Sequence, residues 1–166
     1  MIQKKICMLG GFGVGKTSLV SRFVHSIFSD TYLTTIGVKI DKKTVDVDAE
    51  RVDMVVWDIH GEDEFQKVRM SYLRGASGYL LVVDGTRRAS LDVALGLHAN
   101  AREMLGQVPA ILAINKSDLA SAWDIEPGVL QNLDIPVVRT SAKTGADVEA
   151  AFASLARAMV AGGHAS

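Results

Sequence analysis

The feature that most constrains this chain is a glycine-rich segment of eight residues, Gly10 to Thr17 (GGFGVGKT). It follows the apolar run Ile6 to Leu9 and precedes Ser18 to His25, which has helical periodicity. Glycines between a strand and a helix let the backbone N–H groups turn inward, and the helix N-terminus adds a partial positive charge. The segment matches G-x-x-x-x-G-K-S/T and predicts a cradle for the phosphates of a nucleoside triphosphate.

Two side chains of this loop have separate expected tasks. Lys16 can reach the β- and γ-phosphates, and the Thr17 hydroxyl can bind Mg²⁺. An ordinary glycine-rich turn is the alternative, and both the pattern and its flanks count against it. The pattern does not distinguish ATP from GTP. The residues of this segment predicted to contact nucleotide are Gly11, Phe12, Gly13, Val14, Gly15, Lys16, Thr17 and Ser18.

Short apolar runs that alternate with helical segments predict the fold class. Such runs are typical of strands buried on both faces, and the alternation favours a mostly parallel sheet covered by helices. The expected strands are Ile6 to Leu9, Val52 to Trp57, Tyr79 to Asp84, Ala110 to Asn115 and Pro136 to Thr140. A further strand, Val38 to Val47, is joined to Val52 to Trp57 by the turn Asp48 to Arg51. This hairpin predicts one antiparallel edge strand. Helices should begin near Lys16, Phe65, Leu91, Pro127 and Asp147. The prediction is a three-layer α/β/α P-loop NTPase fold with six strands, a domain at 1–161 and a short tail at 162–166.

Composition excludes several other classes of protein. The 166 residues, 48% of them apolar, fit one domain, and 18 basic against 19 acidic residues give a net charge of −1, which disfavours nucleic acid as a partner. The single cysteine, Cys7, lies in an apolar run and has no second cysteine to pair with. Position 2 is Ile2 and the last five residues contain no cysteine, so we expect no lipid anchor. We expect a cytoplasmic monomer without a membrane-spanning segment.

Two polar segments follow predicted strands and are candidates for recognition of a base. Asn115 to Asp118 (NKSD) follows one strand, and Ser141 to Lys143 (SAK) follows another. The Asp118 carboxylate can accept two hydrogen bonds from guanine, whereas adenine offers no such pair of donors. The Ala142 N–H can donate to the guanine carbonyl, Asn115 can join the loops, and the stem of Lys116 can lie along the base. Alone, NKSD is an ordinary polar turn; after a phosphate loop it favours guanine.

With these motifs in place, the chain resembles the Ras superfamily, and most closely its Rab-like branch, from about Lys5 to Phe152. The joint order and spacing of the motifs carry the resemblance. Besides the phosphate loop, they are Thr34 to Val38 (TTIGV), Trp57 to Gly61 (WDIHG), Tyr72 to Ala76 (YLRGA), Asn115 to Asp118 (NKSD) and Thr140 to Gly145 (TSAKTG).

The resemblance implies a GTP-binding switch that hydrolyses GTP with Mg²⁺. By resemblance, Thr35 and Asp58 join Thr17 at the metal, and the Gly61 N–H finds the γ-phosphate. The resemblance also places Phe28 against the base and Asp30 and Tyr32 near the ribose and phosphates. Loss of the γ-phosphate would release Thr35 and Gly61, which makes a timed switch. Two alternatives stay open: a GTP-binding scaffold with weak or no hydrolysis, and, less favoured, an unrelated P-loop phosphotransferase.

Three positions depart from the family pattern. Glu62 stands where the family has a glutamine that positions water, and we assign it with Lys16 and Gly61 to catalysis. The other interpretation of Glu62 is that it is simply an exposed acidic residue of the loop. Phe12 replaces a small residue that faces the γ-phosphate; it either obstructs an arginine supplied by an activating protein or packs over the loop. His60, in place of the usual alanine, has no assigned role.

The resemblance also implies partner proteins. Ile40, Trp57 and Tyr72 would form an effector surface, although packing within the sheet is the other interpretation. An exchange factor, an activating protein and effectors are expected.

Overall fold

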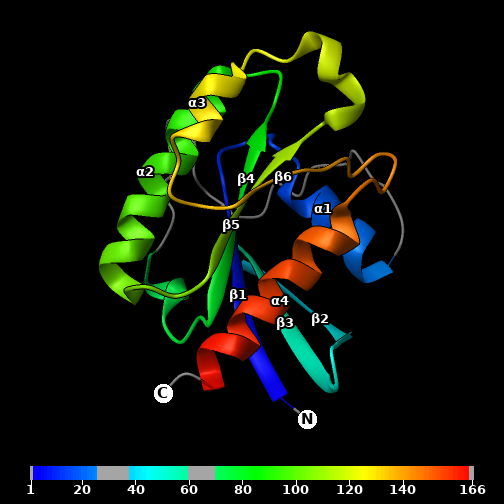
Figure 1. Cartoon of the computed structure of the whole chain (residues 1–166), viewed down its shortest axis with the longest axis vertical. Coiled ribbons are helices and arrows are strands. Elements are labelled where there is room, and N and C mark those ends of the chain that lie inside the picture. Colours follow the sequence, from blue (N-terminus) through cyan, green and yellow to red (C-terminus); the bar gives the residue numbers. More distant parts are fainter. Residues whose placement is uncertain (1, 26–37, 60–69, 165–166) are drawn as a thin grey trace.

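The computed structural model describes residues 2–25, 38–59 and 70–164, and every structural statement below concerns these residues. Their elements alternate between strands and helices along the chain (Figure 1). The strands are β1 (Ile2–Leu9), β2 (Val38–Val47), β3 (Glu50–Ile59), β4 (Gly78–Asp84), β5 (Ala110–Asn115) and β6 (Val137–Arg139). The helices are α1 (Lys16–His25), α2 (Arg88–Leu105), α3 (Pro127–Gln131) and α4 (Val148–His164), with two 3-10 helices, η1 (Met70–Leu73) and η2 (Ser117–Ala122).

The strands form one sheet in the order β2-β3-β1-β4-β5-β6. Edge strand β2 pairs antiparallel with β3, and every other pairing is parallel. The predicted fold class, a six-stranded and mostly parallel sheet with one antiparallel edge strand, is confirmed. The turn between β2 and β3 occupies Asp48 and Ala49, where Asp48 has a φ of 54°.

Helices cover both faces of the sheet, because successive side chains of a strand point to opposite faces. Ile6 and Met8 of β1 join a core that includes α1 and α4, whereas Cys7 and Leu9 join a second core that includes α2. Figure 1 shows α1 and α4 on one side of the strands and α2 and α3 on the other. Burial raises the pKa of the Cys7 thiol to about 12, as expected for a packed core side chain.

Most element positions were predicted closely, and the differences are at the ends. Strand β1 begins at Ile2, four residues before the predicted run, and helix α2 begins at Arg88 rather than Leu91. The two 3-10 helices were not predicted. The helix expected near Phe65 lies outside the described residues. The division into a domain at 1–161 and a tail at 162–166 stays a prediction; helix α4 runs to His164.

Candidate nucleotide-binding site

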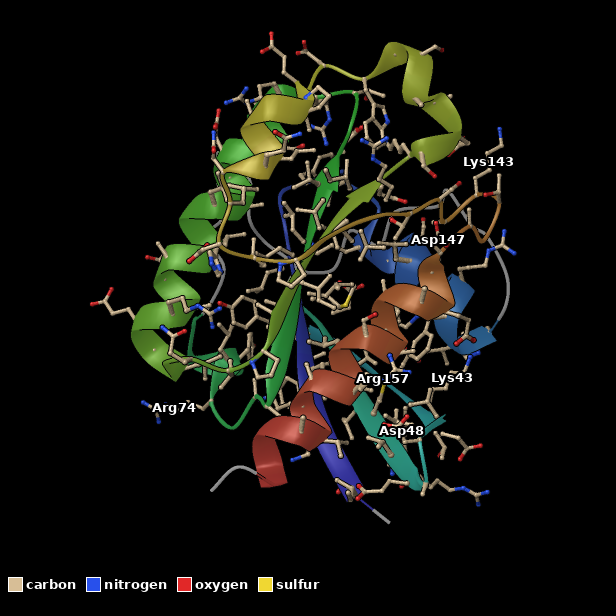
Figure 2. All side chains as sticks on the ribbon, in the orientation of Figure 1. Lys43, Asp48, Arg74, Lys143, Asp147 and Arg157 are labelled. Carbon is tan, nitrogen blue, oxygen red and sulfur yellow. The ribbon has the colours of Figure 1, made fainter. Side chains whose placement is uncertain are left out.

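The candidate site lies along one edge of the sheet. Strands β1, β3, β4, β5 and β6 run parallel, so their carboxyl ends meet at that edge, where ligands bind in open α/β sheets. The residues that follow these strands include the phosphate loop after β1 and the two predicted base loops after β5 and β6. In Figure 2, Lys143 of the second base loop lies beside α1, whereas Asp48 and Arg157 lie toward the opposite end of the molecule.

The phosphate loop joins β1 to α1 as predicted. Gly13 and Gly15 have φ angles of 75° and 101°, in the region that favours glycine. A Cβ on Gly15 would lie only 2.3 Å from the side-chain nitrogen of Asn115, so this position also needs glycine for space. Val14 is fully buried and anchors the loop in the core, whereas Phe12 is 64% exposed and is not part of that core.

Lys16 and Thr17 begin α1 and face different partners. The Lys16 side chain is buried, and its Nζ donates a hydrogen bond to the Gly10 carbonyl at 3.0 Å. The Thr17 Oγ1 donates to Asp58 Oδ2 at 2.7 Å, and Asp58 is fully buried near the end of β3. The structure therefore brings together the predicted metal-binding hydroxyl and the predicted metal-binding carboxylate.

Asn115, at the end of β5, links the phosphate loop to both base loops. Its amide nitrogen donates to the Val14 carbonyl at 3.1 Å. Its amide oxygen accepts from the Thr140 hydroxyl at 3.3 Å and from the Ala142 N–H at 3.1 Å. Because Asn115 is almost fully buried, these hydrogen bonds are protected from water. The Ala142 N–H is thus engaged with Asn115 in this structure.

Asp118 and Ser141 come from different base loops and contact each other. The Ser141 hydroxyl donates to Asp118 Oδ1 at 2.8 Å and accepts from the Thr144 N–H at 3.1 Å. Asp118 is exposed and Ser141 is fully buried, so a buried hydroxyl orients an accessible carboxylate. Lys143 is exposed, and its backbone carbonyl contributes to the loop contacts described below.

Asp84, which the sequence analysis did not single out, accepts hydrogen bonds from several residues of the site. It ends β4, is 1% exposed, and accepts from the Lys116 Nζ at 2.7 Å and the Arg87 Nε at 3.0 Å through Oδ2. Its Oδ1 accepts from the N–H and the hydroxyl of Thr86 at 2.9 and 2.7 Å. Burial alone would raise the pKa of this carboxyl, but the hydrogen bonds from Lys116, Thr86 and Arg87 lower it to about 2. The available signal was its position at the end of a buried strand, which Asp58 and Asn115 share.

Arg22 is a second residue that the sequence analysis missed. It lies on α1, and its Nε donates to the Ala142 carbonyl at 2.8 Å, while its Nη2 donates to the Lys143 carbonyl. The helix that begins with Lys16 thereby holds the base loop that follows β6. No local pattern indicated this contact, because the partners lie about 120 residues apart in the sequence.

The three residues of the predicted effector surface lie together. Ile40 of β2 is opposite Trp57 of β3 in the antiparallel register, and the rings of Trp57 and Tyr72 have centroids 6.3 Å apart. Ile40 is 50% exposed, and Trp57 and Tyr72 are half-buried. The Lys5 ammonium lies 3.6 Å from the centre of the Trp57 ring, within range of a cation–π interaction.

Seven of the singled-out residues lie outside the described part of the chain. They are Phe28, Asp30, Tyr32, Thr35, His60, Gly61 and Glu62.

The fold and the site together define a phosphate-loop nucleotide-binding protein. Residues 5–161 match the sequence profile of the Ras family. The chain is 32% identical over 165 residues to the Ras-related protein Rab-1D of Dictyostelium discoideum, and 34% identical over 158 residues both to the GTP-binding protein ypt1 of Schizosaccharomyces pombe and to Rab-13 of Canis lupus familiaris. Each match covers 92% of this chain and 78% of the relative.

The chain therefore belongs to the Ras family, and it is a GTP-binding, GTP-hydrolysing switch protein. Nothing in these comparisons favours the scaffold without hydrolysis. Proteins of this family act with regulators and effectors. Among the described helices, none is long and apolar enough to cross a membrane.

Proposed function

We propose that one GTP molecule with Mg²⁺ occupies this site, with its phosphates over Gly10 to Thr17 and its guanine at the loops after β5 and β6. The observation that carries the proposal is the buried Asn115 amide, which donates to the Val14 carbonyl and accepts from the Ala142 N–H. One side chain thus joins the phosphate loop to a base loop, so a single nucleotide can span both.

The oxygen atoms of Thr17 and Asp58 suit Mg²⁺, which prefers oxygen ligands and usually shares them with phosphates and water. They lie 2.7 Å apart beside the phosphate loop. Phosphate oxygens would complete the site, as is usual for Mg²⁺. Family resemblance adds Thr35. When bound, Mg²⁺ would offset the negative charge of the phosphates.

Guanine specificity is assigned to Asp118. Its exposed carboxylate, oriented by the buried Ser141 hydroxyl, would accept from the ring N–H and the amino group of guanine. Lys116 gives this loop a second contact, because its Nζ donates to the buried Asp84 carboxylate. The Ala142 N–H would contact the guanine carbonyl by sharing its present hydrogen bond to Asn115.

Hydrolysis is assigned to Lys16, Gly61 and Glu62. The buried Lys16 ammonium, which donates to the Gly10 carbonyl, would donate to the β- and γ-phosphates. Glu62 would accept a hydrogen bond from the attacking water, a task that the family gives to glutamine. Single-turnover hydrolysis by Glu62→Ala tests this assignment: we expect a slower rate, and an unchanged rate would remove Glu62 from the mechanism.

Phe12 is assigned to control of activation. Its exposed ring belongs to the phosphate loop, where an arginine supplied by an activating protein would enter. We propose that any activating protein of this GTPase avoids the usual arginine-finger geometry. Equal acceleration of wild type and Phe12→Gly by an arginine-finger activator would contradict this.

Effector contact is assigned to Ile40, Trp57 and Tyr72, which lie together and are close in sequence to two segments predicted to respond to nucleotide. We also keep the prediction that such contacts, and the protein itself, are cytoplasmic. Capture of partners by the GTP-analogue form, reduced in Trp57→Ala, would support the surface; equal recovery from the GDP form and from the variant would contradict it.

The direct test of the proposed function is the identity and fate of the nucleotide. We expect guanine nucleotide to copurify with the protein, and bound GTP to convert to GDP faster with Mg²⁺ than after chelation. Copurified adenine nucleotide, or conversion that does not depend on Mg²⁺, would contradict the proposal.

A further inference from the structure

Arg87 contacts the phosphate loop from the start of helix α2. Its Nη2 donates to the Phe12 carbonyl at 2.8 Å, across 75 residues of sequence. Its Nε donates at 3.0 Å to Oδ2 of Asp84, a carboxylate that is 1% exposed. The two ends of the guanidinium fork therefore join a buried anion to one peptide bond of the phosphate loop.

The direction of the peptide bond between Phe12 and Gly13 matters for anion binding. In a trans peptide, the carbonyl of one residue and the N–H of the next point in opposite directions. Because the Phe12 carbonyl is directed at Arg87, the Gly13 N–H is directed away from Arg87. A carbonyl turned toward a phosphate would repel it, whereas an N–H turned toward it would bind it.

Local sterics do not fix this peptide by themselves. Gly13 has a φ of 75° and, without a Cβ, can adopt several backbone conformations at similar cost. The backbone of Arg87, in contrast, is held on both sides: its carbonyl accepts from the Ser90 hydroxyl at 2.7 Å, and its N–H donates to the Asp84 carbonyl at 3.0 Å. The Arg87 guanidinium is held by Asp84, so its hydrogen bond to the Phe12 carbonyl constrains the direction of the Phe12–Gly13 peptide.

We propose that Arg87 is a positioning residue for nucleotide binding: it holds the Phe12–Gly13 peptide with the Gly13 N–H available to the phosphates. Through Asp84, which also accepts from Lys116, it links the phosphate loop to the base loop after β5. The inference rests on the proposed placement of the phosphates over Gly10 to Thr17.

The test compares Arg87→Ala with Arg88→Ala, which removes the same charge from the neighbouring exposed position. With Mg²⁺, we expect the Kd for GDP to rise about tenfold in Arg87→Ala, as for loss of a charge-assisted hydrogen bond, and to change less than twofold in Arg88→Ala. The Gly13 amide resonance, which GDP should shift in wild type, should shift much less in Arg87→Ala, a readout that general destabilisation of the fold would not change.

Arg87→Lys separates geometry from charge and serves if Arg87→Ala does not fold. Lysine keeps the charge but cannot reach Asp84 and Phe12 with one rigid fork, so we expect it to recover only part of the affinity. Full recovery by lysine, or wild-type affinity and a wild-type Gly13 shift in Arg87→Ala, would overturn the inference. A wild-type protein that does not bind GDP would instead contradict the proposed function, so the two failures are distinguishable.

Discussion

The phosphate loop and the base loops lie at the same edge of the sheet, yet different interactions hold them. The phosphate loop depends on backbone conformation, with Gly13 and Gly15 at positive φ and Val14 buried in the core. The base loops depend on side chains that meet across long stretches of sequence, such as Ser141 with Asp118 and Arg22 with Ala142. The first kind of interaction leaves a compact sequence pattern, and the second does not.

The largest expected effect comes from a substitution that damages both regions. In Gly15→Ala, the new Cβ would meet the Asn115 amide at 2.3 Å, at a φ of 101° that alanine rarely adopts. We expect affinity for GDP to fall about 10³-fold, from backbone strain and lost hydrogen bonds together. Calorimetric titration checks this. The control is Gly96→Ala, where nothing lies within 4 Å of the new Cβ and affinity should not change; near wild-type affinity in Gly15→Ala would contradict the account.

A smaller effect should be confined to the base loops. Asp118→Asn replaces a carboxylate, which only accepts hydrogen bonds, with an amide, which also donates. We expect it to weaken GDP binding about 10²-fold. It should favour xanthosine diphosphate, because xanthine has a carbonyl where guanine has its amino group. Competition against a fluorescent nucleotide measures both changes. Asp124→Asn makes the same chemical change at an exposed residue after η2 and should alter neither affinity. Unchanged preference for guanine in Asp118→Asn would place the base elsewhere.

Asp84 connects the phosphate loop with the base loop after β5, and its pKa predicts how the free energy of unfolding depends on pH. Because the pKa falls from 3.8 to about 2 on folding, its contribution to the free energy of unfolding is present above pH 4 and is lost as the pH falls from about 4 to about 2. The loss should be about 2 kcal/mol. Urea unfolding between pH 5 and pH 2 should show this dependence in wild type and much less of it in Asp84→Asn. Equal pH dependence in the two proteins would contradict the assignment.

The smallest effect tests the link between α1 and the base loop. Arg22→Ala should speed the release of GDP about tenfold, because it frees the Ala142 and Lys143 carbonyls from their shared donor. Stopped-flow displacement of a fluorescent GDP measures the rate. Arg157→Ala is the matched control, since Arg157 pairs only loosely with Asp48, at 4.0 Å, away from Lys143 in Figure 2. Equal release rates in the two variants would remove Arg22 from the account.

The same division explains what could be predicted from the sequence. Strands β2 and β5 match their predicted ranges, because hydrophobic patterning and short turns are local signals. Helix α2 begins earlier than predicted, because its first turn is polar and its preceding residue, Arg87, is held in extended backbone that local periodicity does not reveal.

The residues of the site also fall into two groups, those that belong to short sequence motifs and those that depend on distant partners. The sequence predicted the glycine loop, Thr17 and Asp118, each of which belongs to a short motif. It did not predict Asp84, Arg87 or Arg22. Besides the local contacts of Asp84 with Thr86 and Arg87, each of the three has a partner between 32 and 121 residues away. Such contacts exist only after the sheet has brought its strand ends together, so no window of neighbouring residues contains them.

In the proposed function, the phosphate loop and the base loops bind one guanine nucleotide together. The most direct measurement is the ratio of the Kd values for GDP and ADP in the presence of Mg²⁺, because the two ligands share their phosphates and differ in the base. We expect GDP to bind at least about 10²-fold more tightly than ADP, since adenine leaves Asp118 without its pair of donors. Equal affinities would mean that only the phosphate loop holds the ligand, and would contradict the assignment of guanine to Asp118 and the base loops.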